Sequence, residues 1–332
     1  MNITFLVGNG FDINLGLKTR YTDFYPTYLS KGHQDILSKA ILANYKNWAD
    51  LEVALGTVLK QVNYWKVDDF LKSKTTLEKD LADYLRKQED LLDLTNPDLP
   101  GEFQRNVVNF FKEFPRREQE AYNTWLSSVN SPINYGFISY NYTACLDRII
   151  KKCRTLPTFS EHMYGNTVFT DTLGDVHHVH GTLDEDLILG VDNESQICNP
   201  TLRTHPQLQK CIVKFKVNRE LGEQRTEHAQ RIIDRSDYIG IYGMSLGDTD
   251  LMWWKYLIRW LHKKPSRRLI LYIYPSSNPN PSGQEKVRLI SEWKDYFLNK
   301  SGTNASQAEQ LRNQIIVVLR SKIFNFNSIS LT

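Results

Sequence analysis

The sequence predicts an α/β fold in which a mostly parallel sheet carries a large all-helical insertion after its first strand. Short apolar runs rich in β-formers alternate with helical segments at the start of the chain and again after residue 131. Between residues 25 and 130 only helical patterns occur. Strands joined by helices imply right-handed crossovers and hence parallel pairing. We therefore predict an α/β domain from residues 1–24 and 131–332 and a helical insertion subdomain from residues 25–130.

The composition is that of a soluble globular protein. The chain has 332 residues, 41% of them hydrophobic, and a net charge of +3, which is too small to imply nucleic-acid binding by itself. No apolar run reaches the roughly 18 residues of a membrane span, and no basic signal-peptide region precedes the first strand, so we expect a cytoplasmic protein. The cysteines form no Cys-x-x-Cys pair, which predicts free buried thiols at Cys145, Cys153, Cys198 and Cys211.

The first predicted strand, Ile3–Val7, ends at the glycine-rich turn Gly8-Asn9-Gly10. In open α/β sheets ligands bind at the carboxyl ends of strands, and glycine lets backbone N–H groups approach a phosphate closely. The dehydrogenase fingerprint is incomplete, because Ile13 stands where glycine or alanine is required. The turn therefore predicts a nucleotide site that is not built for hydride transfer. A tight turn that binds nothing is the alternative.

The predicted insertion contains several helices. Residues 48–59 place apolar side chains on one side of a helix, and residues 66–93 carry an amphipathic pattern that predicts a helix paired with a neighbour. The stretch 95–101, which contains proline and glycine, ends this pattern. Further helices are predicted over 102–129, with an interruption at Pro115.

In the second part of the chain, strands and helices alternate. Strands are predicted at 133–141, 176–180, 187–191, 238–242, 268–274 and 315–319, and helices directly after residue 143, at 219–235, from 251 to about 262 and at 285–299. Residues 193–218 show no regular pattern.

Four polar segments each follow an apolar, strand-like run. They are Gly8–Asp12, Ser139–Thr143, His178–Gly181 and Gly243–Asp250. Successive strand ends of a parallel sheet fall on the same edge, so we expect these segments to converge although they are far apart in the sequence.

Together with neighbouring residues, these segments resemble the AbiH family of bacterial abortive-infection proteins. The resemblance extends over most of the chain and is carried by Asn9-Gly-Phe-Asp12, Gly16-Leu-Lys-Thr19 with Tyr21 and Phe24, Trp48, Glu52, Ser139-Tyr-Asn-Tyr-Thr143, His178-Val-His-Gly181 and Tyr242-Gly-Met-Ser-Leu246. The same order of motifs is similar, more distantly, to sirtuin-like NAD-binding domains. That similarity implies a Rossmann-like, sirtuin-like sheet.

The sirtuin-like resemblance also implies residue roles. Asn141 would hold the nicotinamide ribose, and His180 would be the catalytic histidine. The implied nucleotide-binding residues are Gly8, Asn9, Gly10 and Asp12, with Gly8 and Gly10 at the phosphates, and Gly243, Ser245 and Asp250, with Gly243 and Ser245 at the adenosine half. Thr143 stands where the sirtuin Asn loop commonly has aspartate, and the zinc-binding cysteine pairs are absent. These departures argue against protein deacylation and favour simple cleavage of NAD.

The chemistry of such a cleavage suits these side chains. Breaking the nicotinamide glycosidic bond builds positive charge on the ribose and requires an oriented sugar and an activated hydroxyl or water. Histidine can serve as the base near neutral pH, and a carboxamide can position the ribose or the water without adding charge. We therefore expect an anti-phage effector that uses NAD as substrate or ligand and needs no metal.

Each site residue has a simpler explanation. Asn141 could terminate a strand, and His180 could tie down a strand end. His178 and His180 on one strand face would also suit a metal, although no carboxylate at ligand spacing supports one. The sequence Gly243-Met-Ser-Leu-Gly247 fits the nucleophile-elbow motif of α/β-hydrolases. In those enzymes the catalytic histidine follows the serine in the chain, and the only later histidine here is His262.

Two other functions remain open from the sequence. The first is a non-catalytic sensor that binds a nucleotide and engages a partner. The second is a nuclease, for which the acidic residues between 184 and 194 are the densest metal-ligand candidates. The expected partners are a nucleotide, a phage-derived trigger and a second copy of the chain; no membrane is expected, and nucleic acid stays open.

Overall fold

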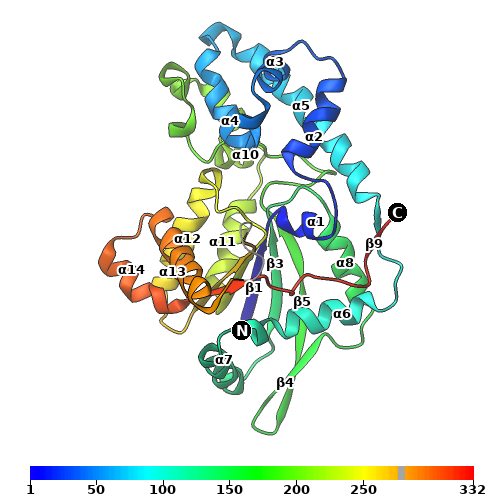
Figure 1. The fold of residues 1–332 in the computed structure, drawn as a ribbon, viewed down its shortest axis with the longest axis vertical. Helices are drawn as coiled ribbons and strands as arrows, with labels where there is room; N and C mark the ends of the chain where they lie inside the picture. The colour runs from blue at the N-terminus through cyan, green and yellow to red at the C-terminus, as the bar shows by residue number, and fades with distance from the viewer. Residues whose placement is uncertain (276–280) are drawn as a thin grey trace.

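The computed structural model of the protein describes residues 1–275 and 281–332. Its centre is a seven-stranded sheet in the order β4-β5-β3-β1-β6-β7-β8 (Figure 1). The strands are β1 (Asn2–Val7), β3 (Asn134–Ser139), β4 (Ser160–Tyr164), β5 (Thr167–His178), β6 (Tyr238–Tyr242), β7 (Arg268–Ile273) and β8 (Ile315–Leu319). All neighbours pair in parallel except β4 with β5. The predicted α/β fold with a mostly parallel sheet is therefore confirmed.

The strand order reverses direction at the middle of the sheet. Counted along the chain, the six parallel strands lie in the order 3-2-1-4-5-6, so the reversal falls between β1 and β6. In such sheets the connections on either side of the reversal leave towards opposite faces, which opens a crevice at the carboxyl ends of the two central strands. A functional site is therefore expected between the ends of β1 and β6.

Alternating side chains of the strands face two different sets of helices. Phe5 of β1 lies in one hydrophobic cluster, and its neighbour Leu6 lies in another on the opposite face. The Phe5 face is covered by α1 (Gly10–Asn14), α6 (Leu99–Val108), α7 (Arg116–Ser128) and α8 (Cys145–Cys153), and the Leu6 face by α11 (Arg225–Arg235), α12 (Leu251–Lys263), α13 (Gly283–Lys300) and α14 (Ala305–Leu311) (Figure 1). Burial on both faces explains why these strands are almost continuously apolar.

A third hydrophobic cluster forms a helical lobe beyond the carboxyl edge of the sheet (Figure 1). It contains α2 (Tyr21–Ser30), α3 (Ile36–Ala43), α4 (Leu51–Val58) and α5 (Val67–Glu89), joined by α9 (Pro206–Ile212), after which α10 (Lys214–Glu220) begins. The helices expected between residues 25 and 130 thus divide between two clusters, because α6 and α7 pack on the sheet. The segment 183–213 contributes Leu189, Val191 and Ile212 to the lobe.

Shorter elements complete the fold. The two-residue strands β2 (Leu92–Asp93) and β9 (Ser330–Leu331) pair antiparallel. Single 3-10 turns occur at η1 (Tyr45–Trp48), η2 (Leu59–Gln61), η3 (Tyr64–Lys66), η4 (Phe110–Glu113), η5 (Glu194–Gln196), η6 (Pro200–Thr204), η7 (Asp248–Asp250) and η8 (Arg312–Gln314). All four cysteines are free, as predicted, but Cys198 and Cys211 are only partly buried.

One predicted strand is absent, and two predicted elements have different bounds. Residues 187–191 form no strand; Val191 makes only an isolated bridge to Val213, because this apolar run is buried in the helical lobe and not in the sheet. The strand predicted at 176–180 is the end of the longer β5, whose hairpin with β4 turns at Gly165, where φ is +57°. The helix predicted at 219–235 begins only at Arg225, since a turn with Gly222 at φ +73° separates it from α10.

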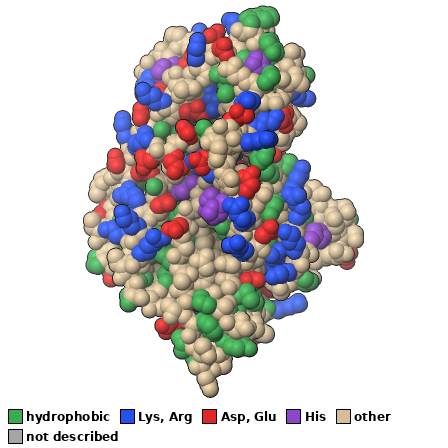
Figure 2. All heavy atoms as spheres, turned by 180° about the vertical axis from the view of Figure 1, so that it is seen from behind, with side chains coloured by type: hydrophobic (Ala, Val, Ile, Leu, Met, Phe, Trp, Pro, Cys, Tyr) green, Lys and Arg blue, Asp and Glu red, His purple; other side chains and the backbone are tan. Residues whose placement is uncertain are grey.

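The surface carries both charge signs. Figure 2 shows Lys and Arg side chains interspersed with Asp and Glu side chains over both the helical lobe and the sheet domain. No helix in the described ranges combines the length and the apolarity that crossing a membrane requires.

Candidate functional site

A cleft of about 1020 Å³ lies at the carboxyl ends of the central strands, between the sheet and the helical lobe. Its position coincides with the reversal of strand order between β1 and β6. The structure brings eight of the nine predicted site residues to its wall: Gly8, Asn9, Gly10, Asn141, His180, Gly243, Ser245 and Asp250. The helical lobe contributes Arg20, Tyr21, Asp50 and Glu52. Side chains from both parts of the molecule would therefore contact a ligand in this cleft.

The glycine turn after β1 is packed against the loop after β6. The N–H of Gly8 donates to the carbonyl of Tyr242 at 2.9 Å, and the N–H of Gly10 donates to the carbonyl of Gly243 at 2.8 Å. A Cβ on Gly10 would lie 2.4 Å from the Gly243 Cα, so a side chain does not fit there. Both N–H groups, expected from the sequence to face a phosphate, are already bonded within the protein. The glycines line the cleft, but the close packing of the two turns is by itself enough to require glycine there.

Asn9 fixes the segment that leads into the helical lobe. Its amide donates to the carbonyl of Thr19 at 3.0 Å, and its side-chain oxygen accepts from the Thr19 hydroxyl at 2.5 Å. Two segments that the sequence analysis singled out, Asn9–Asp12 and Gly16–Thr19, are thus one structural unit. The unit carries Arg20 and Tyr21 to the cleft wall.

Asp12 is buried and does not line the cleft. Its Oδ2 accepts from the Thr143 hydroxyl at 2.6 Å. Burial raises its pKa to about 7, although hydrogen bonds from Thr143 and Asn141 oppose the shift. Asp12 Oδ1 and Asn141 Oδ1 are both buried without a hydrogen-bond partner among the described residues. Asp12 therefore supports the Asn141 loop from behind, in contact with the threonine that replaces the expected aspartate.

The raised pKa of Asp12 predicts a pH-dependent stability. A carboxyl whose pKa is higher in the folded than in the unfolded chain contributes stability below its unfolded pKa and loses it as pH rises through the folded pKa. For Asp12 that window runs from 3.8 to about 7. Asp12→Asn should therefore gain thermal stability relative to the wild type between pH 5 and pH 8, measured by circular dichroism. Asp175→Asn, at an exposed carboxylate, is the control. An Asp12→Asn difference that is equal at both pH values would contradict this assignment.

His178 holds the Asn141 loop from the other side. Its Nδ1 lies 3.0 Å from the Asn141 carbonyl oxygen, and its Nε2 lies 2.9 Å from Asp147 Oδ2. Burial alone would lower the pKa of His178, but the bond to Asp147 outweighs it and the pKa is raised. His178 and His180 thus contact different carboxylates. Among the described residues, including the acidic stretch 184–194, no group of three or more His, Cys, Asp or Glu side chains is placed to hold a metal ion.

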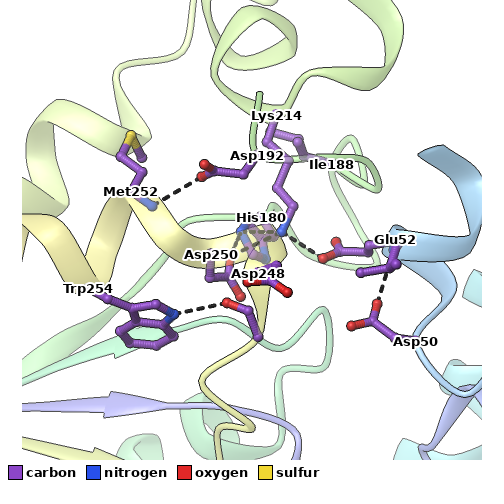
Figure 3. A network of polar contacts seen from close by, with 12 residues as sticks. Asp50, Glu52, His180, Ile188, Asp192, Lys214, Asp248, Asp250, Met252 and Trp254 are labelled. Atoms are coloured by element: carbon purple, nitrogen blue, oxygen red, sulfur yellow. Dashed lines mark hydrogen bonds and ion pairs between the residues drawn. The ribbon is translucent and has the colours of Figure 1, made fainter. Parts of the chain in front are cut away.

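His180 lies in a buried charge cluster with Glu52, Lys214 and Asp250 (Figure 3). Lys214 Nζ is 2.7 Å from Glu52 Oε2 and 3.0 Å from Asp250 Oδ1. His180 Nε2 is 3.4 Å from the same Asp250 oxygen. Four separate segments supply these groups. Glu52 lies on α4, and His180 follows the end of β5; Lys214 begins α10, and Asp250 ends η7. The cluster therefore joins the helical lobe to the sheet domain at the cleft.

Local hydrogen bonds place three members of this cluster. Asp50 caps α4 by accepting from the Val53 N–H at 3.1 Å, which sets the first turn that carries Glu52. Lys214 directly follows Val213, which forms an isolated bridge to Val191. The carbonyl of Val191 also accepts the Lys214 N–H at 3.0 Å. The loop that carries Asp250 is tied to α12, because the Trp254 indole donates to the Gly247 carbonyl at 2.9 Å.

Burial and mutual attraction oppose each other in the cluster. Burial alone would lower the pKa of Lys214, but Asp250 and Glu52 raise it, so the ammonium is retained. Burial alone would raise the pKa of Asp250, but Lys214 and His180 hold it well below its usual range. Burial dominates at Glu52 and raises its pKa against the effect of Lys214. Glu52 is therefore the carboxyl of the cluster that most readily takes up a proton.

Aromatic side chains form much of the remaining wall. Tyr140 meets the His180 ring edge-on, with centroids 5.4 Å apart. The hydroxyls of Tyr140 and Tyr272 are buried without a hydrogen-bond partner among the described residues, as is Asn141 Oδ1. All three residues line the cleft. Buried polar atoms without partners are uncommon in native proteins, and their concentration here indicates a place where a polar ligand or water binds.

The sequence did not reveal the whole site. Lys214 lies in the stretch 193–218, to which no pattern could be assigned, and its one signal is a charge inside the apolar run Cys211–Phe215. Glu52 entered only as part of the family resemblance. Ser245 lines the cleft, but residues 246–250 separate it from α12, and no hydrogen bond joins it to a histidine in the described structure. A nucleophile elbow needs a direct strand-to-helix turn.

Comparison with known proteins adds one finding. The family described as bacteriophage abortive infection AbiH matches residues 4–272. A comparison with curated proteins gives no match. The matched region begins in β1, ends in β7 and includes the Gly8 turn, Asn141, His180 and the Gly243 loop. The chain therefore belongs to the AbiH family.

Proposed function

We propose that this protein is an abortive-infection effector that hydrolyses NAD, or a related nucleotide, at the nicotinamide glycosidic bond. Membership of the AbiH family indicates the anti-phage role. The choice of NAD and of this bond is our own inference from the cleft. It is carried by one observation: Asn141 and His180 line the same cleft, and His180 is paired there with the partly buried Asp250.

The fold supports a dinucleotide as the ligand. The order 3-2-1-4-5-6 is that of Rossmann-like dinucleotide-binding sheets, and these bind their ligand where the order reverses. The sirtuin-like arrangement inferred from the sequence is a more specific version of this proposal. A cleft of about 1020 Å³ is large enough for a dinucleotide, since ligand pockets commonly reach about 1,000 Å³.

The reaction assigns a separate task to each side chain. The bond between ribose C1′ and the nicotinamide nitrogen breaks, and its electron pair leaves with nicotinamide. Water adds to C1′ and gives up one proton to His180, so the products are nicotinamide, ADP-ribose and one proton. Positive charge builds on the ribose in the transition state. The carboxylates around His180 would stabilise that charge.

His180 Nε2 lies 3.4 Å from Asp250 Oδ1, which accepts from Lys214, and 3.5 Å from Lys214 Nζ. Asp250 would hold the imidazole in place and stabilise the positive charge that forms when His180 accepts the proton from water. Asn141, supported by Asp12 and His178, would orient the ribose or the water.

Incubation of the purified protein with NAD tests the proposal directly. We expect release of nicotinamide and ADP-ribose, measured by chromatography, and a loss of about 10²-fold in rate for Asn141→Ala because the sugar is no longer held. Asn166→Ala, at the exposed tip of the β4–β5 hairpin, should leave the rate unchanged. The absence of nicotinamide, or an Asn141→Ala variant as active as the wild type, would refute the assignment.

A non-catalytic nucleotide sensor is the second candidate. It is favoured by the fact that the helical lobe contributes Arg20, Tyr21 and Glu52 to the cleft, so a ligand would touch both parts of the molecule. A sensor would bind NAD in calorimetry, with heat that disappears in Asn141→Ala, and would release no nicotinamide. The same two measurements therefore separate the candidates.

A further inference from the structure

The charge cluster beside the cleft contains more negative than positive groups. One ammonium, on Lys214, faces the carboxyl groups of Glu52 and Asp250. The side chains of Lys214 and Glu52 are 7% and 9% exposed, so solvent compensates little of their charge. Removing one partner of such a buried arrangement leaves an unbalanced charge that the remaining groups must neutralise. Uptake of a proton by one of these groups would neutralise it.

Besides Glu52, His180 is a group of the cluster at which a proton would restore the balance. Its Nε2 lies 3.4 Å from Asp250 Oδ1 and 3.5 Å from Lys214 Nζ. With both carboxyls ionised and His180 neutral, the cluster has one excess negative charge. With His180 protonated, the charges cancel. The net charge of the cluster therefore depends on both Lys214 and His180, which contact the same Asp250 oxygen.

We propose that Lys214 is a positioning residue that sets the proton affinity of His180 by balancing Glu52 and Asp250. The proposal rests on the proposed function for its role in the reaction, but the charge balance itself does not depend on that function. Lys214 acts through Asp250, which it shares with His180, and not through contact with a ligand in the cleft. Because Glu52 belongs to α4, the balance also depends on the helical lobe staying in place.

Other titratable groups around His180 do not change the direction of this effect. The tyrosines facing it are neutral, because burial raises the pKa of Tyr21, Tyr140 and Tyr142 well above the usual value. The other charged groups are Arg20 and Asp50, which line the cleft, and Asp192, which shares a small cavity with His180 and Lys214. The one cation among them balances only one of the two carboxylates, so these groups do not reverse the effect of losing the Lys214 ammonium.

The test is the titration of His180 followed by NMR in protein with labelled histidine. Its resonance is identified by its disappearance in His180→Gln. In Lys214→Met we expect the titration midpoint of His180 to rise by about 1 to 3 pH units, the effect of a charge within a few ångströms. In the double variant Glu52→Gln/Lys214→Met the midpoint should return towards the wild-type value. Lys214→Arg should keep it, because the charge remains.

Lys74→Met is a matched control. Lys74 is a lysine of the helical lobe whose side chain is 8% exposed and which is paired with Glu78; neither residue lines the cleft or contacts His180, Glu52 or Asp250. It should leave the His180 titration unchanged. A Lys214→Met midpoint that is unchanged or lower, or one that the Glu52→Gln substitution does not reverse, would overturn the proposal. The double variant, whose cluster has the same net charge as that of the wild type, should fold even if the single variant is unstable.

Kinetics separates this proposal from the proposed function. If the wild type releases nicotinamide, the acidic limb of its pH–rate profile should move to higher pH in Lys214→Met, in parallel with the NMR midpoint. If no nicotinamide is released, the hydrolase proposal fails while the NMR titration still decides the role of Lys214. A normal NMR shift with an unmoved pH–rate profile would show that His180 is not the base.

Discussion

His180→Asn should reduce nicotinamide release by about 10²–10⁴-fold, the range that a general base contributes. Asparagine removes the imidazole, and its amide can still donate a hydrogen bond to Asp250, so the fold should survive. The measurement is the initial rate at saturating NAD, together with the thermal unfolding midpoint of the variant. The rate should fall without a matching loss of stability.

The control for this result is His262→Asn. His262 is exposed on α12, and it is the only histidine that follows Ser245 in the chain. A serine hydrolase built on Ser245 would make His262 essential and His180 dispensable. Loss of activity in His262→Asn and not in His180→Asn would therefore reject the roles assigned here in favour of that alternative. Cells that produce His180→Asn should also lose protection when they are infected with phage.

The sheet was predictable because each of its central strands carries a local signal. The run Ile3–Val7 is apolar at nearly every position since it is buried on both faces, and it ends at glycines. The β4–β5 hairpin has no such signal, because about half of its residues are exposed and both polar and apolar side chains are among them. Residues 187–191 are apolar like a strand but are buried in the helical lobe, and an apolar run alone does not say what buries it.

The site was predictable where it depends on topology and not where it depends on distant ion pairs. Parallel strands end at one edge, so Asn141, His180 and Gly243 could be expected to meet. Glu52 and Lys214 meet because the fold brings the first turns of α4 and α10 into contact, and neither residue has a local pattern that points to the other. Asp12 shows the same limit: its partner Thr143 lies on another strand end.

Gly243→Ala should cost about 3 kcal/mol or more of unfolding free energy, because two effects combine there. The φ angle of Gly243 is +69°, and a Cβ would lie 2.7 Å from the Phe11 nitrogen. Gly302 has nearly the same φ, +74°, but a Cβ added there would meet nothing within 4 Å. Gly302→Ala should therefore show the backbone cost alone, about 1 to 2 kcal/mol. Urea unfolding of both variants measures the difference.

Gly10→Ala tests the steric effect alone, because the backbone of Gly10 is not in the left-handed region whereas an added Cβ would clash with Gly243. Its Cβ would lie 2.4 Å from the Gly243 Cα, whereas Gly283→Ala, with open space around it, should be nearly neutral. If Gly10→Ala and Gly243→Ala are both far more damaging than their controls, the contact between the two turns is what holds β1 and β6 together at the strand-order reversal. Since the same two turns line the cleft, NAD binding should fall in parallel with stability. Two variants no more damaging than their controls would mean that the glycines are kept free for a ligand, as the sequence first suggested.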